Sequence, residues 1–324
     1  MKAALCEVYG PPSNVVVREV GDPVAKPGRV VVAVEAAAVN FPDVLTVADR
    51  YQVSMPVPFT PGSEFAGRVV AVGDGVTAFA PGDEVMGTTL HGAFAERVVV
   101  PPAALRPRPP GLSPAEAAAF GVTFTTAYHG LTTIGGMNPG DWVVVLGAAG
   151  GVGTAAVDIA ARLGARVIAA AGSPERVAIG LGLGAEAGIA YDRENLKDRI
   201  REITGGHGAD LVIDPVGGSY SEPALRAVRW GGRFVVVGFA AGEIPRIPLN
   251  LVLLKGVIVR GFEIRTIADH RPEAVAQAEV ALDKLTAAGM RPRISAVLPL
   301  SEVAGALELV AGRKATGKIV LSMT

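Results

Sequence analysis

Cysteine is almost absent from this 324-residue sequence, and neither sign of charge is in marked excess. The single cysteine, Cys6, can form neither an internal disulfide nor the four-cysteine cluster of a structural zinc site. A lone thiol is typical of a reduced intracellular protein, so we expect a cytoplasmic location. The formal net charge of −1 lacks the basic excess of a nucleic-acid-binding protein, so we expect no nucleic-acid partner.

Long hydrophobic runs are also absent, although 50% of the residues are hydrophobic. The longest stretch without Asp, Glu, Lys or Arg, residues 117–140, is interrupted by Thr, Gly, His and Pro. A bilayer span needs ~20 predominantly apolar residues, so we expect this stretch to be buried in a protein core and expect no membrane partner. Residues 1–9 lack the basic start and the apolar run of ~7 to 15 residues that mark a secretory signal.

The length suggests two domains, since a domain usually takes about 100 to 200 residues. In the first 110 residues, short Val- and Ala-rich segments alternate with turn signals such as Pro81-Gly82-Asp83, which predicts a β-rich, barrel-like unit. From Asp141 onward, short apolar runs alternate with helical stretches. That alternation is typical of βαβ units and predicts a parallel, doubly wound sheet.

The pattern predicts the following elements after residue 141. Strands are predicted over 142–146, 166–171, 211–214, 233–238 and 257–260, with helices over 151–163, 174–183, 195–204 and 220–228. A helix over 272–288, a strand over 294–298, a helix over 301–311 and a strand over 318–321 follow. This tail is too short for a core of its own, so we expect it to pack on the N-terminal unit.

A glycine-rich loop follows the strand over 142–146 and leads into a helix. It reads Gly147-Ala148-Ala149-Gly150-Gly151-Val152-Gly153. Glycines let backbone N–H groups approach a pyrophosphate at the positive end of a helix, so Ala149, Gly150, Gly151, Val152 and Gly153 are predicted to bind a dinucleotide. Aligned to G-x-G-x-x-G, the first glycine is Ala148. The alternative is that the glycines serve only close strand-to-helix packing.

The end of the next strand predicts which dinucleotide is bound. An NAD site usually carries a carboxylate there, but this strand ends in Ala171-Gly172-Ser173. Arg176 follows in the next turn, where its guanidinium could pair with a 2′-phosphate. Glu175 beside it has a sufficient structural reason to be acidic, because it lies in the first turn of a helix. We therefore expect NADPH.

Several further motifs occur in an order that resembles a known family, the zinc-independent quinone oxidoreductases, or zeta-crystallin-like branch, of the medium-chain dehydrogenase/reductase superfamily. The resemblance covers essentially the whole chain. Its motifs include Asn40-Phe41-Pro42-Asp43, Tyr51-Gln52, Pro61-Gly62-Ser63-Glu64, Gly92-Ala93-Phe94-Ala95-Glu96, Thr126-Ala127, Asp214-Pro215-Val216-Gly217-Gly218, Gly238-Phe239 and Gly317-Lys318-Ile319-Val320.

The resemblance implies a fold and a set of site residues. It implies an α/β protein with a GroES-like β-barrel catalytic domain, residues 1–121 and 264–324, and a Rossmann-type dinucleotide-binding domain, residues 122–263, with the active site in the cleft between them. By position, the implied 2′-phosphate residues are Ser173, Arg176, Tyr191 and Arg313, and Gly238 and Phe239 are implied to line the cofactor site. Asn40 and Thr126 are implied to lie beside the nicotinamide, and Asp43 and Tyr51 at the mouth of the substrate cleft.

Each of these roles has a structural alternative. Tyr191 could be an aromatic residue of an edge strand, Arg313 a surface charge, and Thr126 a hydroxyl at a helix start. Metal binding is not expected, because Asn40-Phe41-Pro42-Asp43 stands where zinc alcohol dehydrogenases place their early Cys-His pair. The sequence also scatters its histidines, which are His91, His129, His207 and His270.

Without a zinc Lewis acid, the acceptor itself must carry the hydride's charge easily. Quinones do so, and so do activated C=C bonds such as those of enals, enones, acrylates or enoyl thioesters. We expect an NADPH-dependent quinone reductase with Tyr51 as the hydrogen-bond or proton donor, and keep the C=C reductase as the alternative. A non-enzymatic, crystallin-like structural or RNA-binding role is the third possibility. The short apolar edge strand over 257–260 also predicts a homodimer.

Overall fold

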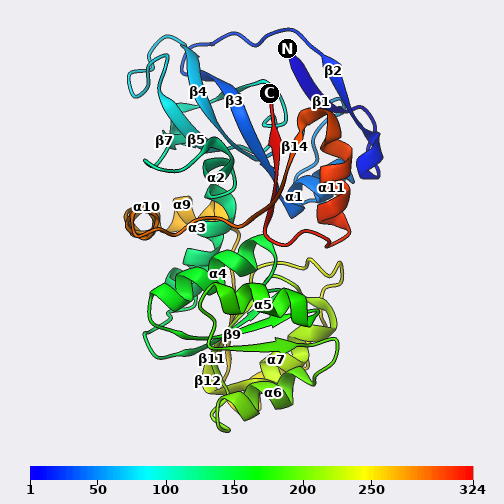
Figure 1. Cartoon of the computed structure of the whole chain (residues 1–324), viewed down its shortest axis with the longest axis vertical. Coiled ribbons are helices and arrows are strands. Elements are labelled where there is room, and N and C mark those ends of the chain that lie inside the picture. The colour runs from blue at the N-terminus through cyan, green and yellow to red at the C-terminus, as the bar shows by residue number, and fades with distance from the viewer. Residues whose placement is uncertain (324) are drawn as a thin grey trace. The chain divides into compact units, whose positions relative to one another are not determined.

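The structure is a computed structural model that describes residues 1–323. The chain divides into two compact units (Figure 1). The N-terminal unit comprises residues 1–122 and the chain from residue 291 onward, and the Rossmann unit comprises residues 123–290. The division differs from the sequence-based one over residues 264–290. Helices α9 (Ile267–His270) and α10 (Pro272–Ala287) fall in the second unit, where the guanidinium of Arg271 donates to the carbonyl of Thr133 at 3.4 Å.

A seven-stranded sheet forms the frame of the N-terminal unit among the described residues. Its order is β14-β15-β3-β4-β5-β7, with β6 paired to β3, and all pairs except β14 with β15 are antiparallel. The strands are β3 (Val30–Val39), β4 (Glu64–Val72), β5 (Glu84–Thr88), β6 (Arg97–Val100), β7 (Leu105–Pro107), β14 (Ile294–Pro299) and β15 (Lys318–Ser322). A separate antiparallel pair consists of β1 (Lys2–Cys6) and β2 (Val15–Glu19).

The C-terminal tail is part of the core of this unit. Leu307 of α11 (Val303–Ala311) and Ile319 of β15 are buried together with Val32 and Phe65 of the main sheet. The other helical segments of the unit are short: α1 (Phe41–Val47), α2 (Pro114–Ala118), η1 (Pro12–Asn14), η2 (Pro102–Ala104) and η6 (Leu300–Glu302). The tail buries its apolar residues in this way because it has too few for a core of its own.

Six parallel strands form the sheet of residues 123–290, in the order β10-β9-β8-β11-β12-β13. They are β8 (Trp142–Leu146), β9 (Arg166–Ala171), β10 (Ala187–Ala190), β11 (Ala209–Asp214), β12 (Val228–Val236) and β13 (Ile258–Gly261). Numbered along the chain, the order is 3-2-1-4-5-6, the arrangement of dinucleotide-binding folds. The predicted mixed fold, with a doubly wound parallel sheet, is therefore confirmed.

Helices connect these strands and cover the sheet (Figure 1). They are α3 (Gly121–His129), continued by one π turn (Gly130–Ile134), α4 (Gly151–Arg162), α5 (Pro174–Gly182), α6 (Leu196–Ile203), α7 (Ser221–Ala227), α8 (Leu249–Lys255), with short turns η4 (Gly218–Tyr220) and η5 (Ile264–Thr266). Among residues 1–323, none of the helices has the length and apolar character that a membrane crossing requires.

The sequence prediction lacks several elements of the Rossmann unit, namely strand β10 and helices α3, α8 and α9. Strand β10 has only four residues, Ala-Gly-Ile-Ala, so its pattern is too short and too small to distinguish from a loop. Helix α8 presents exposed leucines, which hides the usual alternation of apolar and polar faces. Strand β12 also begins earlier than predicted, at Val228, and ends at Val236, which leaves Gly238 in the following loop.

Candidate functional site

The glycine-rich loop leaves the carboxyl end of β8 and enters α4 with unusually close backbone contacts. Gly147 has a φ of +60°, and a Cβ added to Gly153 would lie 2.1 Å from the Gly147 carbonyl oxygen. Gly150 is the N-cap residue of α4, and no side chain caps the helix. The first N–H groups of a helix have no partner within it. This uncapped helix end therefore leaves the backbone donors of Gly151, Val152 and Gly153 for a pyrophosphate, and the loop residues fit a dinucleotide.

Asp214 organises the neighbouring strand end. Its carboxylate ends β11 and accepts hydrogen bonds from the N–H groups of Val216 and Gly217 at 2.9 and 2.8 Å. It also accepts a hydrogen bond from the Ser221 hydroxyl at 2.5 Å. Burial raises the pKa of the Asp214 carboxyl, while these hydrogen bonds act in the opposite direction. The loop after β11 is thereby fixed next to β8, at the position where strand order reverses and such folds bind ligands.

Gly238 and Phe239 follow β12 and contact that same loop. The Ala240 N–H donates to the Pro215 carbonyl at 3.1 Å, and the Ala241 N–H donates to the Val216 carbonyl at 2.8 Å. A Cβ on Gly217 would lie 2.8 Å from the Phe239 ring. The two predicted residues therefore belong to the carboxyl-end rim of the Rossmann sheet.

The predicted 2′-phosphate residues of this unit lie after β9 and β10. The Ser173 hydroxyl caps α5 by accepting from the Arg176 N–H at 3.5 Å, and Arg176 is half-buried in the first turn of α5. Tyr191 follows β10, and its ring centroid lies 4.2 Å from that of Tyr220. A hydrogen bond from Ser173 lowers the pKa of the exposed Glu175 carboxyl, with the charge of Arg193 acting in the same direction.

Three neighbouring strand ends of the N-terminal unit bring Asn40, Glu64 and Lys318 together. Ile319 of β15 pairs with Val39 of β3, and Phe65 of β4 pairs with Ala37 of β3. Lys318, the first residue of β15, and Glu64, the first residue of β4, therefore flank Asn40, which directly follows β3. Distant parts of the sequence meet here because the register of three strands aligns them.

These three side chains form a buried network of hydrogen bonds. The Lys318 ammonium donates to Asn40 Oδ1 at 2.5 Å and to Glu64 Oε2 at 3.1 Å. Asn40 Nδ2 donates to Glu64 Oε2 at 3.1 Å and to the Ala38 carbonyl at 3.4 Å. Glu64 Oε1 accepts from the Val122 N–H at 2.7 Å. Lys318 is 3% exposed and Glu64 is fully buried, so the pair is held away from water.

Asp43 lies beside this network, in the first turn of α1. Its carboxylate accepts a hydrogen bond from the Asn40 N–H at 2.7 Å. Burial raises the pKa of the Asp43 carboxyl to about 6, although that hydrogen bond, Ser63 and the charge of Lys318 act in the opposite direction. Asp43 is 3% exposed, and its carboxylate caps the start of α1 by accepting from the Asn40 N–H. Tyr51 lies beyond α1 in a segment without regular structure and is half-buried.

The remaining predicted residues lie in different units. Thr126 is a buried residue in the middle of α3, in the Rossmann unit, rather than a hydroxyl at a helix start. Arg313 is an exposed residue of the N-terminal unit that follows α11, and it has a φ of +55°. The structure thus brings Asn40 and Asp43 together in one unit, and the glycine loop, Ser173, Arg176, Tyr191, Gly238 and Phe239 along one sheet rim in the other.

The side chains of residues 1–323 offer no set of ligands for a zinc ion. Among residues 1–323, no group of three or more His, Cys, Asp or Glu side chains could hold a metal. In the network around Asn40 and Glu64, the cation is the Lys318 ammonium. Zinc prefers Cys and His ligands. Cys6 is buried, and in the part of the chain that the structure describes it belongs to no cluster of side chains that could bind a metal.

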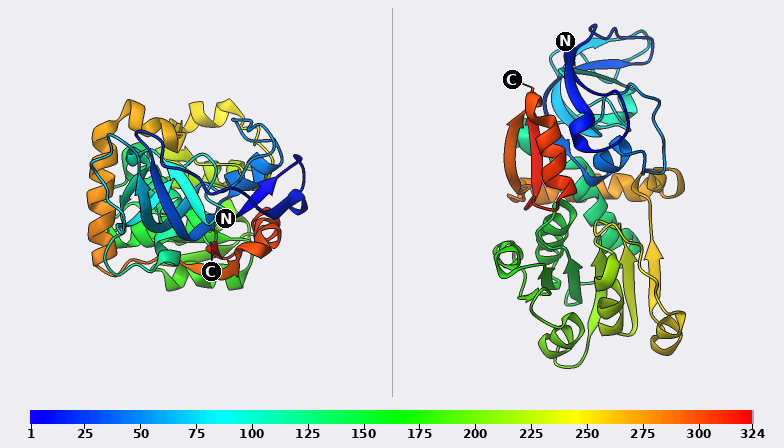
Figure 2. Two further views of the ribbon diagram at one scale, coloured as in Figure 1. Left: turned by 90° about the horizontal axis from the view of Figure 1, so that it is seen from above. Right: turned by 90° about the vertical axis from the view of Figure 1, so that its right-hand side faces the viewer.

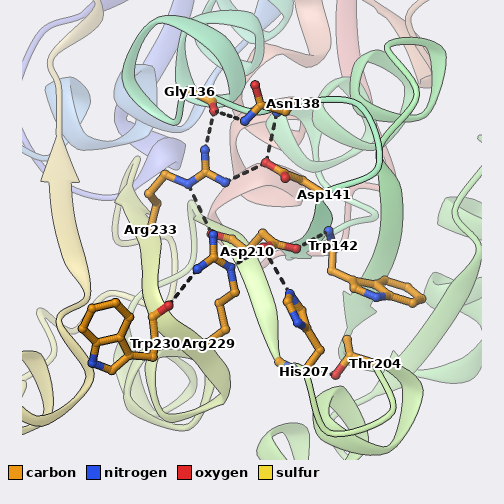
Figure 3. A network of polar contacts seen from close by, with 11 residues as sticks. Gly136, Asn138, Asp141, Trp142, Thr204, His207, Asp210, Arg229, Trp230 and Arg233 are labelled. Atoms are coloured by element: carbon orange, nitrogen blue, oxygen red, sulfur yellow. Dashed lines mark hydrogen bonds and ion pairs between the residues drawn. The ribbon is translucent and has the colours of Figure 1, made fainter.

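A second polar network lies in the Rossmann unit, at the amino-terminal ends of its strands (Figure 3). The glycine loop lies at the other, carboxyl end of these strands. Asp210 accepts from the Trp142 N–H at 2.8 Å, and its other carboxylate oxygen contacts Arg229 and, at 3.2 Å, His207. Burial favours a higher pKa for Asp210, but the hydrogen bonds from Arg229, Trp142 and His207 outweigh it and lower the pKa. This network joins the starts of β8, β11 and β12, away from the glycine loop.

Two family patterns match the chain. The pattern described as the alcohol dehydrogenase GroES-like domain matches residues 26–110, and the pattern described as zinc-binding dehydrogenase matches residues 151–279. The first falls in the N-terminal unit and the second in the Rossmann unit. The fold and the site therefore define a two-domain dehydrogenase of the medium-chain class.

Individual relatives narrow this class. The chain is 37% identical to the quinone oxidoreductase-like protein 2 of Bos taurus over 324 residues, which cover 99% of this chain and 92% of that protein. A quinone oxidoreductase from Thermus thermophilus, whose structures include a complex with NADPH, has a TM-score of 0.86 and 36% identity over all of both chains. The CurK enoyl reductase has a TM-score of 0.89 and 27% identity, covering 100% of this chain and 99% of that one. The chain belongs to the quinone oxidoreductase-like family of the medium-chain dehydrogenases/reductases.

Sequence reasoning assigned no role to Glu64, Lys318 or Asp214, although all three lie in the motifs that carried the resemblance. Each had a local signal, because each is a charged residue next to an apolar strand segment. Charged residues are almost never fully buried unless they are paired. Their partners could not be identified from the sequence, since Lys318 pairs with residues 278 and 254 positions away.

Proposed function

We propose that this protein is an NADPH-dependent, zinc-free reductase that transfers hydride to quinones. The observation that carries the proposal is the glycine loop between β8 and the uncapped start of α4, at the strand-order reversal of a 3-2-1-4-5-6 sheet. The known NADPH complex of the Thermus thermophilus quinone oxidoreductase supports the same function.

The preference for NADPH over NADH rests on the end of β9. Ala171, Gly172 and Ser173 provide no carboxylate for ribose hydroxyls, and Arg176 follows within the first turn of α5. A guanidinium can pair with a phosphate through two parallel hydrogen bonds. We propose that Arg176, with Ser173 and Tyr191 and with Arg313 of the N-terminal unit, binds the 2′-phosphate.

For the reaction itself, bound NADPH supplies a hydride, and the protein orients the acceptor and stabilises its developing charge. We propose that Asn40 and Thr126 orient the nicotinamide and that the Tyr51 hydroxyl donates a hydrogen bond or proton to the acceptor oxygen. A preorganised donor aimed at a developing oxyanion is the kind of group that lowers such barriers. Asp43, whose carboxyl is buried at the start of α1, supports Asn40 rather than transferring a proton.

A second candidate is reduction of activated C=C bonds in enals, enones, acrylates or enoyl thioesters. The similarity to the CurK enoyl reductase favours it, because that protein has the same fold over the whole chain. Both reactions use the same cofactor and leave a delocalised anion, so the same residues would serve either one.

A panel of acceptors tests the proposal. NADPH oxidation would be followed with 1,4-benzoquinone, 9,10-phenanthrenequinone, 2-hexenal and an acryloyl thioester, in parallel with NADH. We expect turnover with a quinone and preference for NADPH. Preference for the enal or the thioester would assign the protein to the C=C reductases. NADPH binding without turnover on any acceptor would leave either an acceptor outside the panel or a non-enzymatic role.

Replacing one arginine tests the cofactor preference. Because Arg176 would lose its phosphate contact, Arg176→Ala is expected to raise the KM for NADPH about tenfold or more, the worth of one charged hydrogen-bonded contact. The KM for NADH should barely change. Arg201→Ala, at an exposed arginine of α6, is the matched control and should change neither value. An equal effect of Arg176→Ala on both cofactors would remove Arg176 from the phosphate site.

We further propose that the protein is a homodimer that joins through β13. This strand is one of the two edges of the Rossmann sheet (Figure 2), and its side chains Ile258 and Val259 are 44% and 46% exposed. Trp230 of the neighbouring strand β12 and Leu253 of α8 are also exposed, at 76% and 80%. An apolar edge strand pairs readily with a second copy. Light scattering should give a dimer for the wild-type protein and a monomer for Ile258→Lys, whereas a wild-type monomer at micromolar concentration would overturn the proposal.

A cytoplasmic location completes the proposal. Its support is the single cysteine, Cys6, which is a buried free thiol. Proteins of reducing compartments keep such thiols reduced.

A further inference from the structure

The Asn40 side-chain amide is held in one orientation by two opposite charges. Lys318 offers only donors, so it can pair with the amide oxygen, Oδ1, and not with the amide nitrogen. The Glu64 carboxylate offers only acceptors, so it can pair with Nδ2 and not with Oδ1. A flipped amide would place N–H groups against the ammonium and oxygen against the carboxylate. The orientation therefore follows from the chemistry of the two partners.

Stability alone does not account for this arrangement. Lys318 and Glu64 are both removed from water, and a buried ion pair often stabilises a fold no better than apolar side chains of similar size. The carboxylate is nevertheless satisfied at both oxygens, by Val122, Asn40 and Lys318. What the charged pair supplies, and apolar residues would not, is a fixed direction for the Asn40 amide.

The network also determines how Asn40 can contact a ligand. Both Nδ2 hydrogens are used among the described residues, one by Glu64 and one by the Ala38 carbonyl. Oδ1 accepts from the Lys318 ammonium, and the capping box at the start of α1 gives the Asn40 side chain a second donor, the Asp43 N–H. A carbonyl oxygen has two lone pairs, so both are used within the protein. A ligand beside Asn40 therefore meets an amide whose direction is already fixed.

We propose that Glu64 and Lys318 are positioning residues that hold the Asn40 amide in one direction beside the nicotinamide half of NADPH. The inference rests on the proposed function, which puts Asn40 beside the nicotinamide. Neither residue touches the cofactor in this proposal, and both act through the direction of the Asn40 amide.

The test is a double variant that removes both charges together, Glu64→Gln with Lys318→Met. The glutamine keeps an oxygen for the Val122 N–H, and no buried charge is left unpaired. The amide of Asn40 is then free to flip, because a glutamine can donate as well as accept. The matched control removes a charged pair of the Rossmann unit, Asp141→Asn with Arg233→Met, whose wild-type atoms lie 2.6 Å apart.

Two ligands, NADPH and adenosine 2′,5′-bisphosphate, separate a positioning role of Glu64 and Lys318 from a structural one. Adenosine 2′,5′-bisphosphate carries the adenosine and 2′-phosphate groups but lacks the nicotinamide, so its affinity reports on the Rossmann unit alone. In the double variant we expect the Kd of this ligand, measured by calorimetry, to stay within about twofold. We expect kcat with a quinone to fall about tenfold, the size of one misdirected polar contact at the nicotinamide. The emission of the bound dihydronicotinamide should also shift. The control variant should leave all three readouts unchanged.

A conservative variant provides the rescue. Lys318→Arg keeps a cation that donates to Oδ1 and to Glu64, so kcat and the nicotinamide emission should return close to wild-type values. A folded double variant with wild-type kcat and emission would overturn the inference. A parallel loss of affinity for both ligands would overturn it as well, because it would indicate a structural role. Wild-type protein that binds neither ligand would instead contradict the proposed function on which the inference rests.

Discussion

Two polar networks of this protein, one around Asn40 and one around Asp210, use the same kinds of charged groups but differ in how deeply those groups are buried. In the N-terminal unit, Lys318 pairs with Glu64, and their side chains are 4% and 1% exposed. In the Rossmann unit, Arg229 contacts Asp210 (Figure 3), and their side chains are 34% and 10% exposed. Both networks join the ends of three strands. They differ in whether water can reach a partner that loses its counterpart.

That difference predicts different costs for losing one partner. A charge left alone in a water-excluded core keeps its full desolvation cost, whereas a charge that water can partly reach regains some hydration. Replacing one residue of the network around Asp210 should therefore cost little folding free energy. The network around Asn40 requires its charges to be removed as a pair.

The largest effect is expected for Lys318→Met alone. This substitution leaves the Glu64 carboxylate buried without a cation, and breaking a buried pair in this way usually costs ~3 to 5 kcal/mol of folding free energy. Chemical denaturation of the variant and of the wild type measures the cost. The Glu64→Gln, Lys318→Met double variant should recover most of the loss, since it buries no unpaired charge. If the single and double variants were equally destabilised, the buried charge would not be the cause.

A pH-dependent effect of intermediate size is expected at Asp43. Its folded pKa of about 6 lies above the ordinary 3.8, so the folded protein holds this proton more tightly than the unfolded chain. The contribution of Asp43 to stability is thus full below about pH 4 and is lost as the pH rises through 6. Asp43→Asn cannot titrate and can still accept from the Asn40 N–H.

The measurement is the unfolding free energy of wild type and Asp43→Asn at several pH values between about 4 and 7. The wild-type value minus the variant value should fall by roughly 2 to 3 kcal/mol across this window, as the shift in pKa requires. Other carboxyls titrate in both proteins, so the difference isolates Asp43. A difference that stays constant with pH would show that burial does not shift this carboxyl.

The smallest of the three effects is expected for Arg233→Met, in the network of Figure 3. Arg233 donates to Asp141 at 2.6 Å and to the Asp210 carbonyl at 3.3 Å, and it also contacts the Gly136 carbonyl. Water can hydrate these groups after the loss, so we expect about 1 to 2 kcal/mol of destabilisation. Thermal and chemical unfolding would measure it. A loss as large as that of Lys318→Met would contradict the comparison between the two networks.

The sequence predicted the Rossmann unit well where local patterns are strong. Strand 142–146, the glycine loop and the following helix agree with β8 and α4 to within one residue, because strand, turn and helix signals coincide there. Strand β10 escaped prediction because four small residues carry little pattern. Residues 264–290 are assigned to the second unit by contacts such as that of Arg162 with the Ala288 carbonyl, at 3.2 Å, which no local pattern predicts.

By itself, the sequence determined the two kinds of unit, the glycine-rich turn before a helix, the missing carboxylate after β9 and the family, since each is set by neighbouring residues or by an ordered series of motifs. Only the tertiary structure decided that Lys318 and Glu64 flank Asn40. That contact depends on the register of β15 on β3 and of β3 on β4, which brings Lys318 to partners 278 and 254 positions away. A charged residue shows its need for a partner in the sequence, but the folded sheet selects the partner.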